Sequence, residues 1–231
     1  QLGFQEKRQM SDNTVGSKFY FNMGLLMLAL VIAGFGSAAF VRGTSPLELP
    51  LLFHLHGAIF IAWFLLFINQ ARLIGIDAYL LHKKLGYASL IVAVMMMVTG
   101  VLMAAASYRR GFSPVPDVTL QQFMAFPLID ISGFLIFYSL GVLNRGNGLF
   151  HKHCMLMAGI AILDPALARM AIAIGAIPLA LVLHVGLVGL VMVHDRRTAG
   201  GIHVITWAGL AFVILRLVFI FTIAAGGAWA S

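Results

Sequence analysis

The sequence predicts an all-α membrane protein that crosses a lipid bilayer seven times, and three observations lead to this fold class. The chain of 231 residues is 61% hydrophobic and only 10% charged, whereas a soluble domain carries about 25% charged residues. Its apolar residues form long continuous runs, which suit membrane helices of about 20 residues and lack the alternation of a membrane β-barrel. Most of its Lys and Arg residues fall in the polar stretches between these runs, as in the loops of helical membrane proteins.

Seven apolar segments can be placed along the chain, each bounded by polar residues, glycine or proline. The first begins at Phe19 and is too long for the apolar part of a signal peptide, so we expect it to remain as a helix. Only Ala176 lies between the fifth segment and the sixth, which predicts a tight hairpin. The expected spans are 19–41, 50–71, 85–107, 120–143, 154–175, 177–194 and 202–226.

Domain organisation and orientation follow from the same pattern. A polar and basic tail, residues 1–18, precedes a single transmembrane domain, residues 19–231. Seven crossings put Arg42, Arg109 and Arg110 on one side of the membrane. The larger set of basic residues falls on the other side: Lys7, Arg8, Lys18, Arg72, Lys83, Lys84, Arg145, Lys152, Arg196 and Arg197. Because positive loops stay in the cytoplasm, we expect the N-terminus inside and the C-terminus outside.

Short motifs also recur between pairs of spans. Phe-Leu-Leu-Phe at 64–67 and Phe-Leu-Ile-Phe at 134–137 are each followed by a His-Lys pair that contains His82 or His151, and His203 opens the seventh span. The pattern is consistent with one helix plus three related hairpins, or with chance similarity between apolar helices. Met95, Asp164 and Arg216 each lie thirteen residues beyond one of these histidines. We therefore expect all three at one depth in the membrane.

Ionisable residues within the expected spans gather in the outer half of the bilayer. A charge inside a bilayer costs several kcal/mol unless it is paired, so each of these residues is a candidate for function. One interpretation is structural: an aspartate paired with an arginine would fix the register of the bundle, while Arg169 extends to the surface. The group, which comes from five of the seven spans, is His54, His56, Asp130, Asp164, Arg169, His184 and Arg216.

A second interpretation of this layer is a b-type haem site. His56 and His184 are expected at equal depth, about 10 Å below the outer ends of the second and sixth spans. Two imidazoles at equal depth on different helices can ligate a haem iron from both sides, and arginines can offset the charge of its propionates. The predicted cofactor-binding residues are therefore His56, His184, Arg169 and Arg216.

The same layer contains ligands for a transition metal, because imidazole and carboxylate groups both bind such ions. That candidate set is His54, His56, His184, Asp130 and Asp164. A protein without any cofactor is an equally plausible outcome. No catalytic residue can be assigned, although Asp130, Ser132 and His184 would form an intramembrane hydrolase site if they met.

A second cluster of histidines is expected at the cytoplasmic face. It comprises His82, His151, His153, His194 and His203, with Asp195 beside them. Lysines at 83, 84 and 152 are interleaved with it. Basic loops of this kind usually contact anionic lipid headgroups, which favours lipid contact over a metal site.

A set of short motifs extends from the second span to the seventh. They are His54-Leu55-His56-Gly57, Trp63, Gln70, Leu81-His82-Lys83-Lys84-Leu85-Gly86, His151-Lys152, Asp164, His203, Trp207-Ala208-Gly209 and Arg216. In these motifs the chain resembles a group of uncharacterised bacterial multi-pass membrane proteins, which implies the bacterial inner (plasma) membrane and transfers no catalytic residue. Its histidines on apolar helices are also similar, more weakly, to membrane cytochromes of the b561 kind, which implies haem b.

The sequence thus leads to two main functional hypotheses. One is a haem b or metal protein that serves electron transfer or a redox complex, and the other is a non-catalytic accessory subunit of a larger membrane assembly. An intramembrane hydrolase and a small-solute carrier are further alternatives. The expected partners are the lipid bilayer and other membrane subunits. Nucleic acid is not expected, because the net charge of +7 comes from loop residues.

Overall fold

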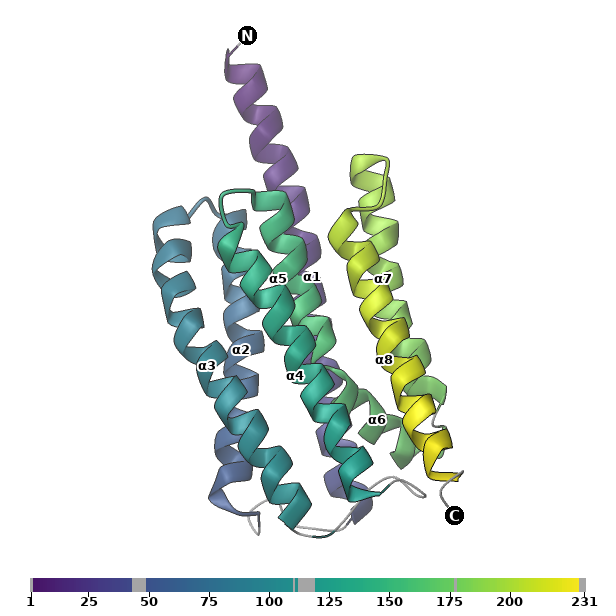
Figure 1. Ribbon diagram of the computed structural model, residues 1–231. Coiled ribbons are helices and arrows are strands. Elements are labelled where there is room, and N and C mark those ends of the chain that lie inside the picture. Colours follow the sequence, from purple (N-terminus) through teal and green to yellow (C-terminus); the bar gives the residue numbers. More distant parts are fainter. Residues whose placement is uncertain (1, 43–48, 110, 112–118, 177, 229–231) are drawn as a thin grey trace.

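The computed structural model is a bundle of helices that run up and down between two ends (Figure 1). It describes the backbone of residues 2–42, 49–109, 111, 119–176 and 178–228. The helices in those ranges are α1 (Leu2–Arg42), α2 (Leu51–Gly75), α3 (Tyr79–Arg109), α4 (Leu120–Leu143), α5 (Gly148–Ala161), α6 (Asp164–Ala173), α7 (Pro178–Ala199) and α8 (Val204–Ala228). Because α5 and α6 follow one another as a single span from Gly148 to Ala173, the chain passes through the bundle seven times.

Length and composition support the membrane assignment. Six spans among the described residues are long and apolar enough to cross a bilayer, and the apolar stretch Val204–Ile220 of α8 is the shorter seventh. Large apolar side chains cover the outside of the bundle; Leu51 and Ile91, for example, are 72% and 65% exposed. Lipid is the solvent that such a surface requires. The predicted all-α, polytopic fold is confirmed.

The two ends of the bundle differ in charge. The N-terminus lies at one end and the C-terminus at the other, as an odd number of crossings requires (Figure 1). We call the end with the α2–α3, α4–α5 and α7–α8 turns the basic end. Residues in or next to those turns include Arg72, Lys83, Lys84, Arg145, Arg196 and Arg197. Which end faces the cytoplasm stays a prediction, and Arg110 lies outside the described residues.

Two odd-numbered spans begin earlier than the sequence predicted. Helix α3 begins at Tyr79 rather than 85, and α5 begins at Gly148 rather than 154. At α5 the reason is a cap: the Asn147 side chain accepts a hydrogen bond from the Phe150 N–H at 3.1 Å, which satisfies a free donor of the first turn. Hydropathy marks the apolar part of a helix, whereas the helix itself extends into the polar interface. Helix α1 likewise begins at Leu2, so it includes most of the stretch 1–18 that was predicted as a polar tail.

The fifth span is broken in its middle, where one uninterrupted span over 154–175 was expected. Helix α5 ends at Ala161, and α6 begins at Asp164 with Pro165 in its first turn. Proline is favoured at the start of a helix and cannot donate the next hydrogen bond of a continuing one. The break brings Asp164 to the N-terminus of α6, where a negative side chain is favoured by the helix dipole.

Helix α5 is the central element of the bundle. Every residue from His153 to Leu163 except Met155 is buried. Met27 of α1 lies against Gly159, where an added Cβ would come within 3.1 Å of its sulfur. Neighbours α1, α4, α7 and α8 surround it. Polar side chains on this helix and its α6 continuation therefore face other helices rather than lipid.

Candidate functional site

Two separate polar layers join α5, α6, α7 and α8, one with a residue of α4 and the other with a residue of α1. The arginine layer lies about midway along the bundle and consists of Asp130, Asp164, His184 and Arg216. The histidine layer lies at the basic end and consists of Tyr20, His153, Asp195, His203 and Thr206.

Arg216 of α8 joins two carboxylates in the arginine layer. Its Nε donates to Oδ1 of Asp130 on α4, and its Nη2 lies 3.3 Å from the other oxygen of that carboxylate. The same Nη2 donates to Oδ2 of Asp164 at 2.6 Å. The side chains of Arg216 and Asp130 are each 5% exposed, and that of Asp164 is 20% exposed. The arginine therefore ties α4, α6 and α8 together, with Asp164 as its most accessible partner.

His184 of α7 completes this layer. Its Nε2 lies 3.0 Å from the carbonyl oxygen of Ile160, near the end of α5, and its Nδ1 lies 3.6 Å from Oδ1 of Asp164. A carbonyl oxygen only accepts, so Nε2 carries a proton. The layer then holds two carboxylates, one guanidinium and one imidazole. Its charges balance when His184 is doubly protonated, and one negative charge is in excess when it is not.

Prolines stand beside both carboxylates. Pro127 lies inside α4, three residues before Asp130, and Pro165 follows Asp164 directly. Proline leaves backbone carbonyls without a helical partner, and inside a membrane these need another donor. His184 reaches the Ile160 carbonyl oxygen at the end of α5, which also accepts the Leu163 N–H at 3.1 Å. Broken or proline-interrupted helices at membrane depth are typical of the binding sites of membrane carriers.

The structure does not bring the predicted haem ligands together. His56 lies on α2, which packs on α1 and α3, whereas α7 with His184 packs on α5, α6 and α8. His56 Nδ1 is 3.3 Å from the Thr99 hydroxyl of α3. Arg169 donates to the Pro165 carbonyl at 2.7 Å and lies 4.6 Å from the centre of the Phe35 ring. The haem site stays a prediction, without a geometry that supports these four residues.

Of the predicted metal ligands, Asp130, Asp164 and His184 lie together in the arginine layer, whereas His54 and His56 lie apart on α2. His54 is at the opposite end of the bundle from the basic turns, with Nε2 3.1 Å from the Leu49 carbonyl oxygen. Arg216 contacts both oxygens of Asp130 and one oxygen of Asp164. Across the described part of the chain, no group of three or more His, Cys, Asp or Glu side chains is arranged to hold a metal ion. Ser132, the hydrolase candidate, is exposed and donates to the Leu128 carbonyl at 2.7 Å.

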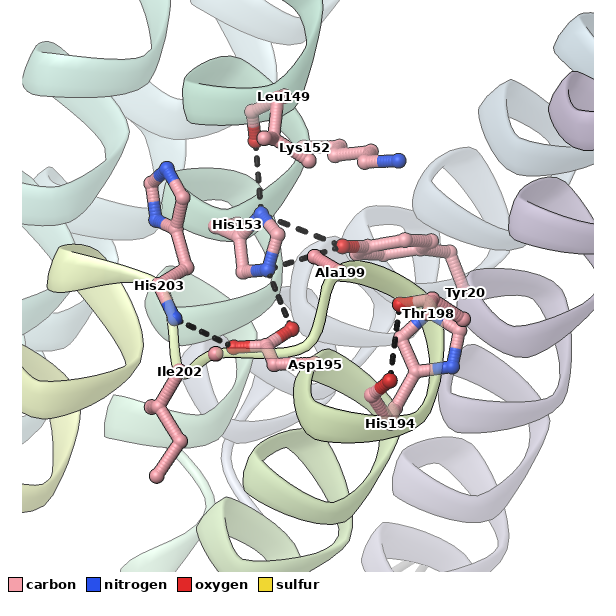
Figure 2. A pocket seen from close by; sticks show the side chains of 11 residues that line it. Tyr20, Leu149, Lys152, His153, His194, Asp195, Thr198, Ala199, Ile202 and His203 are labelled. Carbon is pink, nitrogen blue, oxygen red and sulfur yellow. Dashed lines mark hydrogen bonds and ion pairs between the residues drawn. The ribbon is translucent and has the colours of Figure 1, made fainter.

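The histidine layer is built around a His153–Asp195 ion pair (Figure 2). His153 Nε2 lies 2.8 Å from Oδ1 of Asp195, and its Nδ1 lies 2.7 Å from the Leu149 carbonyl oxygen. Oδ2 of the same carboxylate accepts from the Thr206 hydroxyl at 2.6 Å and from the His203 backbone N–H at 3.1 Å. The Tyr20 hydroxyl lies 3.3 Å from Nδ1 and 3.4 Å from Nε2 of His153, so every polar side-chain atom of His153 and Asp195 has a hydrogen-bond partner.

His203 has a different role in this layer. Its Nδ1 accepts the backbone N–H of Ile205 at 3.2 Å, so its Nε2 carries the proton. The ring stacks on His153 with centroids 4.3 Å apart. Burial lowers the pKa of His203, the positive charges of His153 and Lys152 lower it further, and Asp195 opposes them. His203 is therefore a neutral donor in a region of positive potential.

A cavity of about 100 Å³ opens beside the histidine layer. Its wall includes Tyr20 of α1, Lys152 of α5, His194 of α7 and the α7–α8 turn (Figure 2). The Lys152 ammonium lies 5.2 Å from the centre of the Tyr20 ring, and the His194 ring stacks on Phe19 at 3.7 Å. The described residues include no carboxylate in an ion pair with Lys152. Among the described residues, the Lys152 ammonium is thus a cation at the cavity without an ion-pair partner.

The expected cluster of basic-end histidines is divided into two groups. His82 and His151 face one another across α3 and α5, with ring centroids 6.3 Å apart. His153, His194 and His203 line the cavity. Sequence reasoning did not include Tyr20 or Thr206, because an aromatic residue near a membrane interface and a hydroxyl in an apolar helix carry no signal of a shared site.

With this geometry established, the chain was compared with known protein families, curated proteins and solved structures, and none of them matches it. The fold and the two polar layers are therefore the basis on which a function can be assigned.

Proposed function

We propose that the protein is a multi-pass carrier of the bacterial inner membrane that moves a small anion together with protons, and that the arginine layer binds the protons. The observation that carries the proposal is the network of Asp130, Asp164, His184 and Arg216 at the break between α5 and α6. Intramembrane chains of Asp and His are characteristic of proton pathways in pumps and transporters.

Charge balance supports a proton at this site. The two carboxylates exceed the single arginine by one negative charge, and His184 lies 3.6 Å from Asp164 to supply the missing positive charge. Loss of that proton leaves an unbalanced charge among apolar side chains, which is costly. Proton occupancy is therefore coupled to how tightly α4, α6, α7 and α8 hold together, as alternating access requires.

The helix break supports a moving element at the same place. Ile162 and Leu163 lie between α5 and α6, so the two halves of this span are joined by a short non-helical hinge. Asp164, the most accessible carboxylate of the layer, stands at the start of the second half. A change in its protonation acts directly on the hinge.

The same geometry supports the haem hypothesis less well. Iron needs one free nitrogen from each axial imidazole, and both nitrogens of His184 already face oxygen atoms. A visible absorption spectrum of the purified protein, oxidised and then reduced with dithionite, tests it. Sharp haem bands that disappear in His184→Ala would replace the carrier proposal with the redox function.

The direct test is proton movement in proteoliposomes. Purified protein is reconstituted into liposomes that contain a pH-sensitive dye, and phosphate, sulfate, acetate or lactate is added outside. We expect at least one anion to drive a change of internal pH that protein-free liposomes do not show. If no anion in this panel does so, the carrier proposal is wrong and the accessory-subunit hypothesis gains support.

Two variants assign the proton site. Asp164→Asn is expected to abolish proton movement while it retains exchange of labelled anion across the membrane, because exchange needs no net proton transfer. Retained exchange also shows that the variant has folded. Asp77→Asn is the matched control, because Asp77 lies in the exposed α2–α3 turn and hydrogen-bonds Tyr79 at 2.9 Å. Equal loss in both variants would remove the arginine layer from the mechanism.

A further inference from the structure

The cavity at the basic end has the features of an anion site rather than a gap in packing. It is lined by ionisable side chains from α1, α5 and α7, by apolar side chains such as Leu149 and Ile202, and by the turn before α8. Two of the lining side chains, His153 and Asp195, are only 2% and 3% exposed and form an ion pair with each other. The wall is thus rigid and built from buried polar groups.

The Asp195 carboxylate in the cavity wall faces partners within the layer. One carboxylate oxygen faces the His153 imidazole, and the other accepts from Thr206 and from a backbone N–H. The cation in the cavity wall is the ammonium of Lys152. The imidazoles of His194 and His203 also line the cavity, and the Nε2–H of His203 is a donor. The cavity therefore presents one cation and two imidazoles.

The turn between α7 and α8 forms part of the same wall. Gly200 adopts a positive φ of 72°, a conformation that glycine takes without steric cost. The turn that it makes brings Gly201 and Ile202 to the cavity. Successive backbone N–H groups in turns with a left-handed residue form concavities that bind anions.

From this donor set we infer that the cavity binds a phosphate group, carried either by a soluble phosphate or by the headgroup of an anionic lipid. A phosphate has several oxygens that accept from different directions, and Lys152, His194 and His203 approach from three different elements. The cavity is too small for a haem or a nucleotide, because sites for such ligands occupy at least about 300 Å³. Its place at the basic end is also the level at which headgroup phosphates lie in a bilayer.

The inference deepens the proposed carrier function, and rests on it only in naming soluble phosphate as the transported anion. Its test measures binding alone. If the protein binds phosphate but moves no protons, the phosphate site stands and the carrier function is wrong. If it moves protons with another anion and binds no phosphate, the carrier function stands and the phosphate site is wrong.

Isothermal titration calorimetry with inorganic phosphate in detergent is the first arm of the test. We expect the wild-type protein to bind phosphate, and Lys152→Gln to bind it about tenfold more weakly, the loss of one charge-assisted hydrogen bond. Lys152→Arg keeps the cation and is expected to retain most of the affinity, which also excludes misfolding as the cause. Lys83→Gln is the matched control, because Lys83 is an exposed lysine at the same end.

The second arm distinguishes a lipid from a soluble ligand. Thermal unfolding is compared in nanodiscs of phosphatidylcholine alone and in nanodiscs of equal parts phosphatidylcholine and phosphatidic acid. Stabilisation by phosphatidic acid without binding of inorganic phosphate assigns the site to a lipid headgroup, and it should be lost in Lys152→Gln. The inference is overturned if neither phosphate nor phosphatidic acid has an effect, or if Lys83→Gln loses as much binding as Lys152→Gln.

Discussion

The arginine layer and the histidine layer each contain one histidine and one aspartate from the same two spans, in exchanged positions. On α7, His184 and Asp195 are eleven residues apart, and on the α5–α6 span, His153 and Asp164 are also eleven apart. Each layer therefore contains one His–Asp pair between these two spans, but the histidine and the aspartate change places. At 1.5 Å per residue the layers are about 16 Å apart along α7.

What differs is the contribution of α8. It places Arg216 in one layer and Thr206 in the other. The arginine adds a charge that needs a second carboxylate, Asp130, and the result is a closed network of paired groups. The threonine adds only a hydrogen bond to the His153–Asp195 pair, and Lys152 has no ion-pair partner among the described residues. The arginine layer is therefore suited to holding the helices together and binding a proton, and the histidine layer is suited to binding an anion.

The apolar residues between the layers keep them independent. Leu187, Val188 and Val191 of α7 are at most 3% exposed, as is Val213 of α8. Such side chains exclude the water that would connect the two polar regions. Variants in one layer should therefore leave the other intact, and their effects can be compared directly.

The largest expected effect is that of Arg216→Met. It leaves the carboxylates of Asp130 and Asp164 buried without their cation, which costs about 3–5 kcal/mol of unfolding free energy. Denaturant unfolding in detergent measures the loss. Asp130→Asn in the same background should recover part of it, because it removes one of the orphaned charges. Arg196→Met, at the exposed basic end, is the control, and an equal effect there would contradict the role given to the arginine layer.

Asp195→Ala tests the histidine layer and is expected to cost less. It removes the acceptor of three hydrogen bonds and leaves His153 buried without a counter-charge, for a loss of about 1–3 kcal/mol. The nearby cavity gives the orphaned donors access to water, which is why the loss should be smaller than that of Arg216→Met. The same unfolding measurement compares the two. A larger loss for Asp195→Ala than for Arg216→Met would contradict the view that the arginine layer is the one shielded from water.

Depth could be predicted from the sequence, whereas helix neighbours could not. Counting thirteen residues from His151 and His203 put Asp164 and Arg216 at one level, and they form an ion pair at 2.6 Å. This works because the rise per residue of a helix is fixed. Counting from the outer ends of the second and sixth spans matched His56 with His184, although their helices do not pack together. Hydropathy carries no record of the order of helices around a bundle.

Two local features were beyond sequence reasoning for different reasons. A proline within an apolar run is compatible with a kinked helix or with a break, so Asp164-Pro165 alone did not predict two helices. Tyr20 reaches His153 from more than a hundred residues earlier in the chain, and only the packing of α1 on α5 brings them together. In both cases tertiary packing, rather than local pattern, decided the structure.

The smallest expected effect concerns the pH dependence that His203 gives to the histidine layer. Because the folded protein lowers the pKa of His203, the unfolded chain takes up its proton first as the pH falls. The stability contributed by the neutral ring is therefore complete above the ordinary histidine pKa of about 6.5 and is lost as the pH falls through the lower folded value. The groups that face the ring are His153 and Lys152 of α5 and Asp195 of α7.

Thermal unfolding of the wild-type protein and of His203→Gln, from about pH 7.5 to about pH 5.5, isolates this contribution. We expect the melting temperature of the wild-type protein to fall by roughly a degree more than that of the variant, a small difference because the ring is partly exposed and screened. Saturating phosphate should reduce the difference, since a bound anion favours the protonated ring. A variant whose melting temperature follows that of the wild-type protein at every pH would show that the positive charges near the cavity do not act on His203. Lys152 would then be the remaining residue that distinguishes the histidine layer from the arginine layer.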